Sequence, residues 1–244
     1  MNSILPENIN CIVVSPQNKE SLDKFQTFYH GVYREAFPNQ DECESYENFI
    51  NYIHEYGSGK LYVHILIFYT GDDIVGGMVI DYFDDIKTMA IEFIVVAKKY
   101  QRQGLARKMM KYTEQYLINR HNKEIEWTII EVENPKLVPV DENSNIYFWD
   151  KCKFKTIDFT YIQPALSPAQ KPVEILLLCA YHHFSNAGLI GVEHVKAFLK
   201  LYSHYAMGIA DPLGNPTIVK MFEALDKKNT DTIDLIDLKE FMNE

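Results

Sequence analysis

Residues 91–110 constrain the fold more than any other stretch, because a pattern typical of a buried strand runs directly into a turn and a helix. Residues 91–96 read Ile-Glu-Phe-Ile-Val-Val, a β-branched and aromatic run that suits a buried strand. From residue 105 onward, apolar side chains recur at helical spacing. They are Leu105, Met109, Met110, Tyr112, Tyr116 and Leu117. The pattern predicts a strand, a tight turn and a helix in immediate succession.

The turn at 101–106 has the composition of an anion-binding site. It reads Gln-Arg-Gln-Gly-Leu-Ala, and its small residues at 104 and 106 let a ligand approach the backbone closely. The first N–H groups of a helix have no intrahelical partner and lie at the positive end of its dipole. Arg102, Arg107 and Lys108 add positive charge. The turn therefore predicts a phosphate-bearing ligand, and the plain alternative is a structural connection with a surface glycine.

The motif Gln101-x-x-Gly104-x-Ala106 resembles the Q/R-x-x-G-x-G/A motif of the GNAT superfamily of acyl-CoA-dependent N-acetyltransferases. Alanine stands in place of the second glycine, which the motif allows, and the strand before it is similar to the family's fourth strand. The resemblance implies that acetyl-CoA binds here as co-substrate, with its pantetheine arm on the strand and its pyrophosphate on the turn amides. The implied cofactor-binding residues are Ile94, Val95, Val96, Gln101, Arg102, Gln103, Gly104, Leu105, Ala106 and Arg107.

Hydrophobic periodicity predicts the element order β-α-α-β-β-β-α-β-α-β-β up to residue 180. The elements expected before the motif are a strand at 10–15, helices at 19–36 and 43–56, and strands at 61–69, 74–83 and 88–97. Those expected from the motif onward are helices at 103–120 and 143–151 and strands at 124–132, 154–162 and 173–180. The GNAT resemblance implies the same order in an α/β (α+β) fold, with a mixed, splayed sheet flanked by helices and acetyl-CoA in the wedge between the fourth and fifth strands.

Glu92 is the candidate general base. It stands in an otherwise apolar strand, where an unpaired carboxylate is costly and needs a partner or a raised pKa. An amine must lose a proton to attack a thioester, and a partly desolvated glutamate can accept that proton directly or through water. The resemblance adds that some superfamily members carry a functional acid here. The alternative is a glutamate at a strand end that pairs with a lysine or reaches solvent.

Residues 148–154, Phe-Trp-Asp-Lys-Cys-Lys-Phe, resemble the family's Phe-Tyr-Glu-Lys-x-Gly-Phe segment. Trp149 stands where many members have the tyrosine that protonates the departing CoA thiolate, and Lys153 stands for the glycine. An indole N–H donates a hydrogen bond but is not a useful general acid. Tyr147 is the remaining candidate acid, although two residues along a helix place it on the opposite side, where it would be a core aromatic.

Three polar residues lie at the end of the strand predicted at 124–132, and the resemblance places that strand end near the acyl-transfer centre. They are Glu131, Glu133 and Asn134. Glu131 and Glu133 share one face of a strand by alternation. They are the candidate substrate-binding residues for a cationic acceptor, and the alternative is an exposed acidic strand end.

After residue 181 the character of the chain changes, which predicts two domains, 1–181 and a small all-α extension at 182–244. The extension is expected to form helices at 191–206 and 217–226 and an EF-hand-like helix–loop–helix at 222–241. Aligned on Ile233 as loop position 8, positions 1, 3, 5, 6 and 12 are Asp226, Lys228, Thr230, Asp231 and Asp237. A lysine at position 3 and the missing glycine argue against calcium. The paired histidines His182 and His183 have no third ligand at metal-binding spacing, so no metal site is expected.

Composition narrows the class of partner. The 244-residue chain carries a formal charge of −10, which argues against nucleic acid and is compatible with a cationic acceptor. Its apolar runs are shorter than the roughly 20 residues that cross a bilayer, and no secretory signal is evident at the N-terminus. Four separated cysteines indicate a reduced, cytoplasmic protein without a disulfide framework; they are Cys11, Cys43, Cys152 and Cys179. No membrane partner is expected, and a homodimer is left open.

The favoured function is an acetyltransferase that moves an acetyl group from acetyl-CoA to a primary amine by direct attack. The amine belongs to a small molecule, a lysine or a protein N-terminus. A non-catalytic acyl-CoA-binding or protein-interaction module is the alternative, and it fits Trp149 and the helical extension. A calcium-responsive regulator is the weakest of the three hypotheses.

Overall fold

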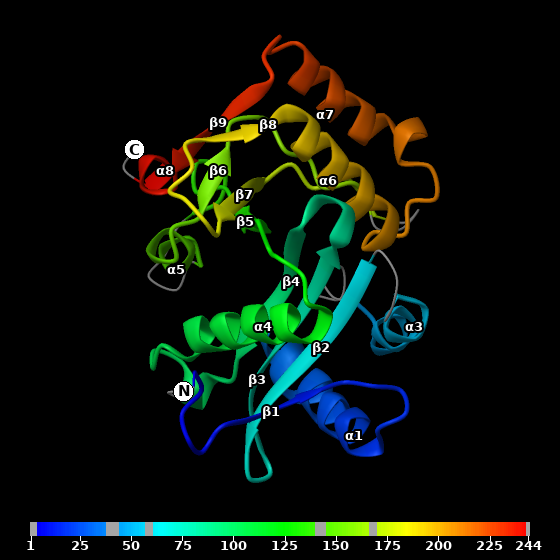
Figure 1. Ribbon diagram of the computed structural model, residues 1–244, viewed down its shortest axis with the longest axis vertical. Helices are drawn as coiled ribbons and strands as arrows, with labels where there is room; N and C mark the ends of the chain where they lie inside the picture. Colours follow the sequence, from blue (N-terminus) through cyan, green and yellow to red (C-terminus); the bar gives the residue numbers. More distant parts are fainter. Residues whose placement is uncertain (1–3, 38–43, 57–60, 140–144, 166–169, 243–244) are drawn as a thin grey trace. The chain divides into compact units, whose positions relative to one another are not determined.

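The computed structural model describes residues 4–37, 44–56, 61–139, 145–165 and 170–242. The chain divides into two compact units, Met1–Ile125 and Glu126–Glu244 (Figure 1). The predicted helix start at Cys43, the turn at 57–59 that was expected to end this helix, and the predicted helix start at 143 lie outside the described residues. The boundary after residue 181 stays a prediction.

Among its described residues, the first unit contains four antiparallel strands in the order β1-β2-β3-β4. They are β1 (Asn10–Val13), β2 (Leu61–Thr70), β3 (Asp73–Phe83) and β4 (Thr88–Val96). β2 and β3 form the predicted hairpin, and Gly71 in its turn has φ of +55°, a left-handed conformation that favours glycine. Short 3₁₀ turns lie at Asp84–Ile86 and Lys98–Tyr100.

Helices cover both faces of this sheet (Figure 1). The helix predicted at 19–36 is continuous but changes pitch: α1 (Lys19–Phe28) passes into a π-helical turn (Tyr29–Tyr33) and α2 (Arg34–Ala36). Asn18 caps α1, because its Oδ1 accepts a hydrogen bond from the Ser21 amide at 3.2 Å. α3 spans Tyr46–Tyr56 and α4 spans Leu105–His121.

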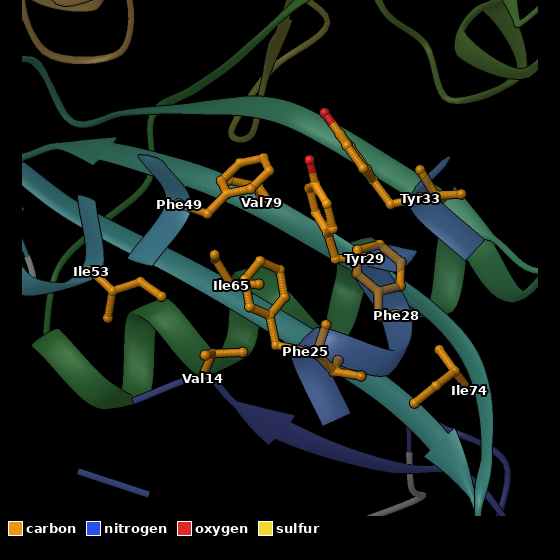
Figure 2. Close-up of a cluster of buried hydrophobic side chains, with 12 residues drawn as sticks. Val14, Phe25, Phe28, Tyr29, Tyr33, Phe49, Ile53, Ile65, Ile74 and Val79 are labelled. Atoms are coloured by element: carbon orange, nitrogen blue, oxygen red, sulfur yellow. The ribbon is translucent and has the colours of Figure 1, made fainter. Parts of the chain in front are cut away.

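An aromatic core joins α1, the π-helical turn and α3 to one face of the sheet (Figure 2). Its buried members are Val14, Phe25, Phe28, Tyr29, Tyr33, Phe49, Ile53, Ile65, Ile67, Ile74, Val79 and Val95. α4 packs on the opposite face, where Thr113 Oγ1 lies 3.4 Å from Met78 Sδ. Met78 and Val79 are adjacent in β3 and point to opposite faces, as strand alternation requires.

The described part of the second unit contains five strands in the order β5-β7-β6-β9-β8, and all their described pairings are antiparallel. They are β5 (Trp127–Glu133), β6 (Lys155–Ile157), β7 (Leu176–His182), β8 (Leu189–Gly191) and β9 (Thr232–Asp237). Its helices are α5 (Ile146–Lys151), α6 (Val192–Tyr205), α7 (Pro216–Asp226) and α8 (Lys239–Met242), with a 3₁₀ turn at Pro212–Gly214. The strand predicted at 154–162 is therefore only three residues long.

The prediction of an all-α segment at 182–244 is wrong, because this segment also contains β8 and β9. β9 pairs with β8 and with β6. Residues 232–235 alternate between exposed and buried, with Ile233 and Leu235 buried, which is the period of a strand. The calcium-loop alignment concealed this alternation.

Both units combine helices with antiparallel strands, which confirms the mixed α/β class. The predicted splay between the fourth and fifth strands stays a prediction. No helix within the described ranges has both the length and the apolar content needed to span a membrane.

Candidate active site

The turn between β4 and α4 has a backbone shaped to expose amide groups. Arg102 and Gly104 adopt left-handed φ values of +61° and +73°. Gly104 is the N-cap of α4 and has no side chain to accept a hydrogen bond from the first helical amides. Residues 101–104 are all exposed. The amides at the start of α4 therefore face a surface that an anion can reach, at the positive end of a helix of 17 residues.

Side chains fix this turn to the end of β4. Gln101 Nε2 donates a hydrogen bond to the Val96 carbonyl at 2.9 Å, and Gln103 Nε2 donates to the Lys99 carbonyl at 3.3 Å. The first motif residue thus ties the turn to the strand, which explains why an amide side chain is useful at that position.

Basic residues surround the turn but differ in their partners. Lys98 pairs with Glu35 at 2.8 Å and Lys99 pairs with Asp73 at 2.7 Å, both on the surface. Arg107 and Lys108 are exposed on the first turn of α4. Their charges add to the helix dipole and favour a polyanionic ligand such as a pyrophosphate.

The three β4 residues predicted to bind cofactor differ in exposure. Val95 is buried in the aromatic core, whereas Ile94 and Val96 are half-buried. Val96 pairs with Gly76 of β3, where an added Cβ would lie 2.3 Å from the Val95 carbonyl oxygen. β3 therefore needs a glycine at residue 76 to approach β4 so closely.

Glu92 is the extra residue of a β-bulge. Ile80 pairs with Ile91 and Val79 pairs with Phe93, so Glu92 has no opposite residue in β3. A bulge interrupts strand alternation and redirects a side chain. The sequence predicted Glu92 as a candidate base but gave no sign of the bulge.

The polar neighbour of Glu92 is Asp81 of β3, a residue that the sequence analysis missed. Asp81 is 1% exposed, and burial raises its pKa to about 6, although its interaction with the nearby Glu92 limits the rise. Tyr52 of α3 lies close to both carboxyl groups, and burial followed by the charge of Glu44, Glu92 and Asp81 raises its pKa. The signal was present, because an aspartate inside an apolar strand needs the same explanation as Glu92.

The three predicted substrate-binding residues lie in the second unit, at the end of β5, and two have polar partners there. Glu131 is half-buried, and its two carboxylate oxygens accept hydrogen bonds from the Tyr161 hydroxyl and from Gln163 Nε2, the latter at 3.1 Å. Burial nevertheless raises the pKa of Glu131 to about 7. Asn134 Oδ1 accepts from the Lys136 amide at 3.0 Å, which makes a local turn, while Glu133 is exposed.

Tyr147 and Trp149 of α5 have opposite environments. The Tyr147 side chain is 43% exposed, whereas Trp149 is 5% exposed and its ring lies 5.0 Å from that of Phe154. The alternative that Tyr147 is a core aromatic is therefore wrong, and Trp149 takes the core position. Lys153 has φ of +69°, so it adopts the left-handed conformation that suits the glycine of the resembling segment.

The structure thus groups the predicted site residues by unit. The first unit holds Glu92 and the predicted cofactor residues, which follow one another along β4, the turn and α4. The second unit holds Tyr147, Glu131, Glu133 and Asn134. Their assignment as site residues stays a prediction.

Comparison with known proteins agrees with this geometry. Residues 26–140 match the family model described as the acetyltransferase (GNAT) family. This range includes β4, the turn, α4 and β5. Over these residues the chain is similar to the acetyltransferases of the GNAT family. None of the curated proteins compared with the chain matches it.

Solved structures share the fold at low sequence identity. An acetyltransferase described as of the GNAT family from Bacteroides thetaiotaomicron is 16% identical, with a TM-score of 0.59 over 82% of this chain and 99% of that one. An acetyltransferase from Streptococcus agalactiae is 14% identical, with a TM-score of 0.50 over 73% of this chain and 100% of that one. A GNAT family acetyltransferase from Elizabethkingia anophelis with acetyl-CoA bound is 16% identical, with a TM-score of 0.47 over 73% and 100%. The first two establish the similarity of fold.

Proposed function

We propose that this protein is an acetyltransferase that transfers the acetyl group of acetyl-CoA to a primary amine. The observation that carries the proposal is the exposed turn at 101–104, which leads into the uncapped N-terminus of α4 and directly follows the strand that carries Glu92. The family match at residues 26–140 covers this whole segment and supports acyl transfer.

The turn fits the anionic part of acetyl-CoA. Amides of residues 102–106 would hold the pyrophosphate, because they lie at the positive end of α4 and Gly104 allows close approach. Arg107 and Lys108 would add charge. The backbone of Ile94 and Val96 would hold the pantetheine arm.

Glu92 would act as the base. The amine nitrogen attacks the thioester carbonyl carbon, a C–N bond forms, the C–S bond breaks, and the proton of the amine passes to Glu92 directly or through water. The departing thiolate takes a proton from water or from Tyr147, whose exposed ring leaves its hydroxyl accessible. Positioning and backbone electrostatics would supply most of the rate.

Cofactor binding is tested separately from catalysis. In Gly104→Asp a carboxylate would cap the first amides of α4 and repel the pyrophosphate, so calorimetry should show acetyl-CoA binding weakened by about tenfold or more. Gly208→Asp is the matched control, since Gly208 is also an exposed glycine with a left-handed φ, +66°, and no heavy atom within 4 Å of an added Cβ. Equal affinities for the two variants would contradict the assignment of the turn.

Catalysis is tested by release of the CoA thiol with a panel of primary amines. We expect turnover with at least one amine and loss of kcat in Glu92→Gln. Binding of acetyl-CoA without turnover for any amine would instead support the non-catalytic acyl-CoA-binding or protein-interaction module. The proposal places the activity in the cytoplasm, with an acceptor of cationic character, and leaves a homodimer open.

We further propose that the segment 182–244 packs as an EF-hand-like helix–loop–helix extension and does not bind calcium. Asp226, at the first loop position, pairs with Lys196 at 2.5 Å, and Lys228, at the third, pairs with Asp158 at 2.7 Å. These ion pairs occupy side chains that a calcium loop would need. A calcium titration that gives a millimolar or tighter isotherm would contradict this proposal.

A further inference from the structure

The second unit contains a cavity of about 610 Å³ whose described lining includes none of the predicted site residues. Its walls come from α5, β6, β7, the loop at 183–187, β9 and α8. His182 in this lining pairs with Trp127 at the start of β5, whereas the predicted acceptor residues 131–134 lie at the other end of that strand. The two ends of β5 are about 20 Å apart. The cavity is therefore separate from those residues, and its volume suits a small organic ligand.

Lys155 of β6 is a largely buried cation in this cavity. Its side chain is 18% exposed, and Nζ donates a hydrogen bond to the Ala187 carbonyl at 3.1 Å. Its counter-charge is Asp237 of β9, whose Oδ1 lies 3.6 Å away, which is longer than a hydrogen bond. An ammonium group has three N–H donors. Lys155 therefore keeps donor capacity that these two contacts do not use.

The carboxylate of Asp237 is shared with a second lysine. Lys239 Nζ lies 3.2 Å from Asp237 Oδ2. A hydrogen bond from Lys239, together with the charge of Lys155, lowers the pKa of Asp237. Lys153 and Asp150 also line the cavity, and neither forms an ion pair with another described residue. With three lysines and two aspartates, the lining carries one excess positive charge.

The two histidines in the lining do not change this charge. The Phe184 amide donates a hydrogen bond to His182 Nδ1 at 3.3 Å. An amide N–H can only donate, so this nitrogen carries no proton and the His182 ring is neutral. Burial lowers the pKa of His183 to about 4, so this ring is neutral at neutral pH. Glu126 lies 3.8 Å from His182 Nε2 but does not line the cavity. A chain with a formal charge of −10 thus has a cavity of positive charge.

The uncharged part of the lining offers apolar surface. Phe184 is 66% exposed in the loop after β7, and its ring lies 6.0 Å from that of His182. The rings of Phe154 and Tyr181 lie 5.6 Å apart, and Leu235 of β9 is buried. Aromatic rings give a ligand a large apolar contact surface. A ligand that fits this lining therefore combines an apolar body with a negative charge.

We infer that this cavity binds a small organic monocarboxylate with an apolar body, whose carboxylate pairs with Lys155. One carboxylate neutralises the single excess charge, whereas a phosphate monoester brings nearly two negative charges. The apolar body would lie against Phe184 and Tyr181. Because the lining joins β6, β7 and β9, the bound ligand would stabilise the second unit against unfolding. The inference does not depend on the proposed acyl transfer.

The first experiment locates the ligand on the full chain, with benzoate as the probe. Amide NMR should show saturable shifts at residues 184–187 as benzoate is added. Benzamide, which has the same ring without the charge, should bind at least about tenfold more weakly. Equal concentrations of sodium chloride control for ionic strength. The absence of a saturable shift at these amides up to about 10 mM benzoate, or equal affinity for benzamide, would overturn the inference.

The second experiment tests the charges of the lining by calorimetry. Lys155→Gln should weaken benzoate binding by about tenfold or more. Lys151→Gln is the matched control, because Lys151 is an exposed lysine outside the lining, and it should leave the affinity unchanged. Equal affinities of these two variants would contradict the role of Lys155.

Asp237→Asn tests the charge balance in the opposite direction. It raises the excess positive charge of the lining from one to two, so the affinity for phenyl phosphate should rise by a larger factor than the affinity for benzoate. An equal or smaller rise for phenyl phosphate would show that charge balance does not select the ligand, and the inference would fall. If Lys155→Gln does not fold, this variant and the wild-type titration with benzoate and benzamide still decide.

Discussion

Replacing Asp81 by asparagine should stabilise the protein at neutral pH. Burial raises the pKa of Asp81 from its ordinary value of 3.8 to about 6. Between these two values the folded chain binds more protons than the unfolded chain, so the free energy of unfolding falls as pH rises. The difference of about two pKa units corresponds to a penalty of about 3 kcal/mol above pH 6. Asparagine has the shape of the protonated acid and carries no such penalty.

Urea denaturation of wild type and Asp81→Asn at pH 4, 5, 6 and 7 would measure this effect. We expect the variant to gain about 3 kcal/mol on the wild type between pH 4 and pH 7, with most of the change below pH 6. Curves for the two proteins that run parallel across this range would refute the reasoning, because Asp81 would then carry no ionisation penalty in the folded state.

Asp73, at the start of the same strand, provides a control of opposite sign. It is exposed, and a hydrogen bond from Lys99 lowers its pKa. A lowered pKa contributes stability above the unfolded value, and this stability is lost as pH falls through the folded value. Asp73→Asn should therefore lose stability relative to wild type as pH rises, whereas Asp81→Asn gains it.

Three further predictions concern stability measured by the same denaturation assay. Gly77→Ala should lower the free energy of unfolding by about 1–3 kcal/mol, because the added Cβ would lie 2.7 Å from Phe28 Cζ. Combining it with Phe28→Leu should recover part of this loss. Lys153→Gly should raise it by about 1 kcal/mol, since Lys153 has φ of +69°. Burial and the neighbouring His121 lower the pKa of His64 to about 3. Below about pH 6.5 His64 is therefore protonated in the unfolded chain but not in the folded chain, so the free energy of unfolding should fall as pH falls. His64→Gln should reduce this loss.

Each of these predictions has a control within the chain. Gly31→Ala adds a Cβ that meets no heavy atom within 4 Å, so it should not destabilise as Gly77→Ala does. Lys151→Gly, in the last residue of α5, should lower stability where Lys153→Gly raises it, because glycine disfavours a helix. If His64→Gln keeps the full wild-type loss of stability in acid, another group is responsible for that loss.

The cofactor segment could be predicted from sequence because its determinants are local. A buried run at 91–96, a turn with Gly104 and a helical repeat from residue 105 specify strand, turn and helix within a few residues of each other. The helix 19–36 was predictable for the same reason, although its π-helical turn was not. Local propensity and periodicity carry such information directly.

The proximity of Asp81 and Glu92 could not be predicted, because it depends on the strand register. Asp81 and Glu92 meet only if β3 and β4 pair with one extra residue in β4, and nothing in either strand's composition specifies a bulge. Strand β9 was missed for a different reason. The alternation of exposed and buried residues in β9 covers only four residues. The EF-hand alignment on Ile233 assigned these same residues to a calcium-binding loop.

Glu92 and Glu131 look alike in sequence, since each is an acid within an apolar strand, and the structure gives them different chemistry. Glu131 receives a donor on each carboxylate oxygen, from Tyr161 and Gln163, so it already belongs to a local hydrogen-bond network. A cationic acceptor would have to displace these donors, at the cost of leaving buried polar groups unpaired. Glu92 instead lies near the buried Asp81, in the strand that leads toward the turn at 101–104. Of the two, Glu92 is therefore the one suited to accept a proton, and Glu131 is suited to hold the segment of Tyr161 against β5.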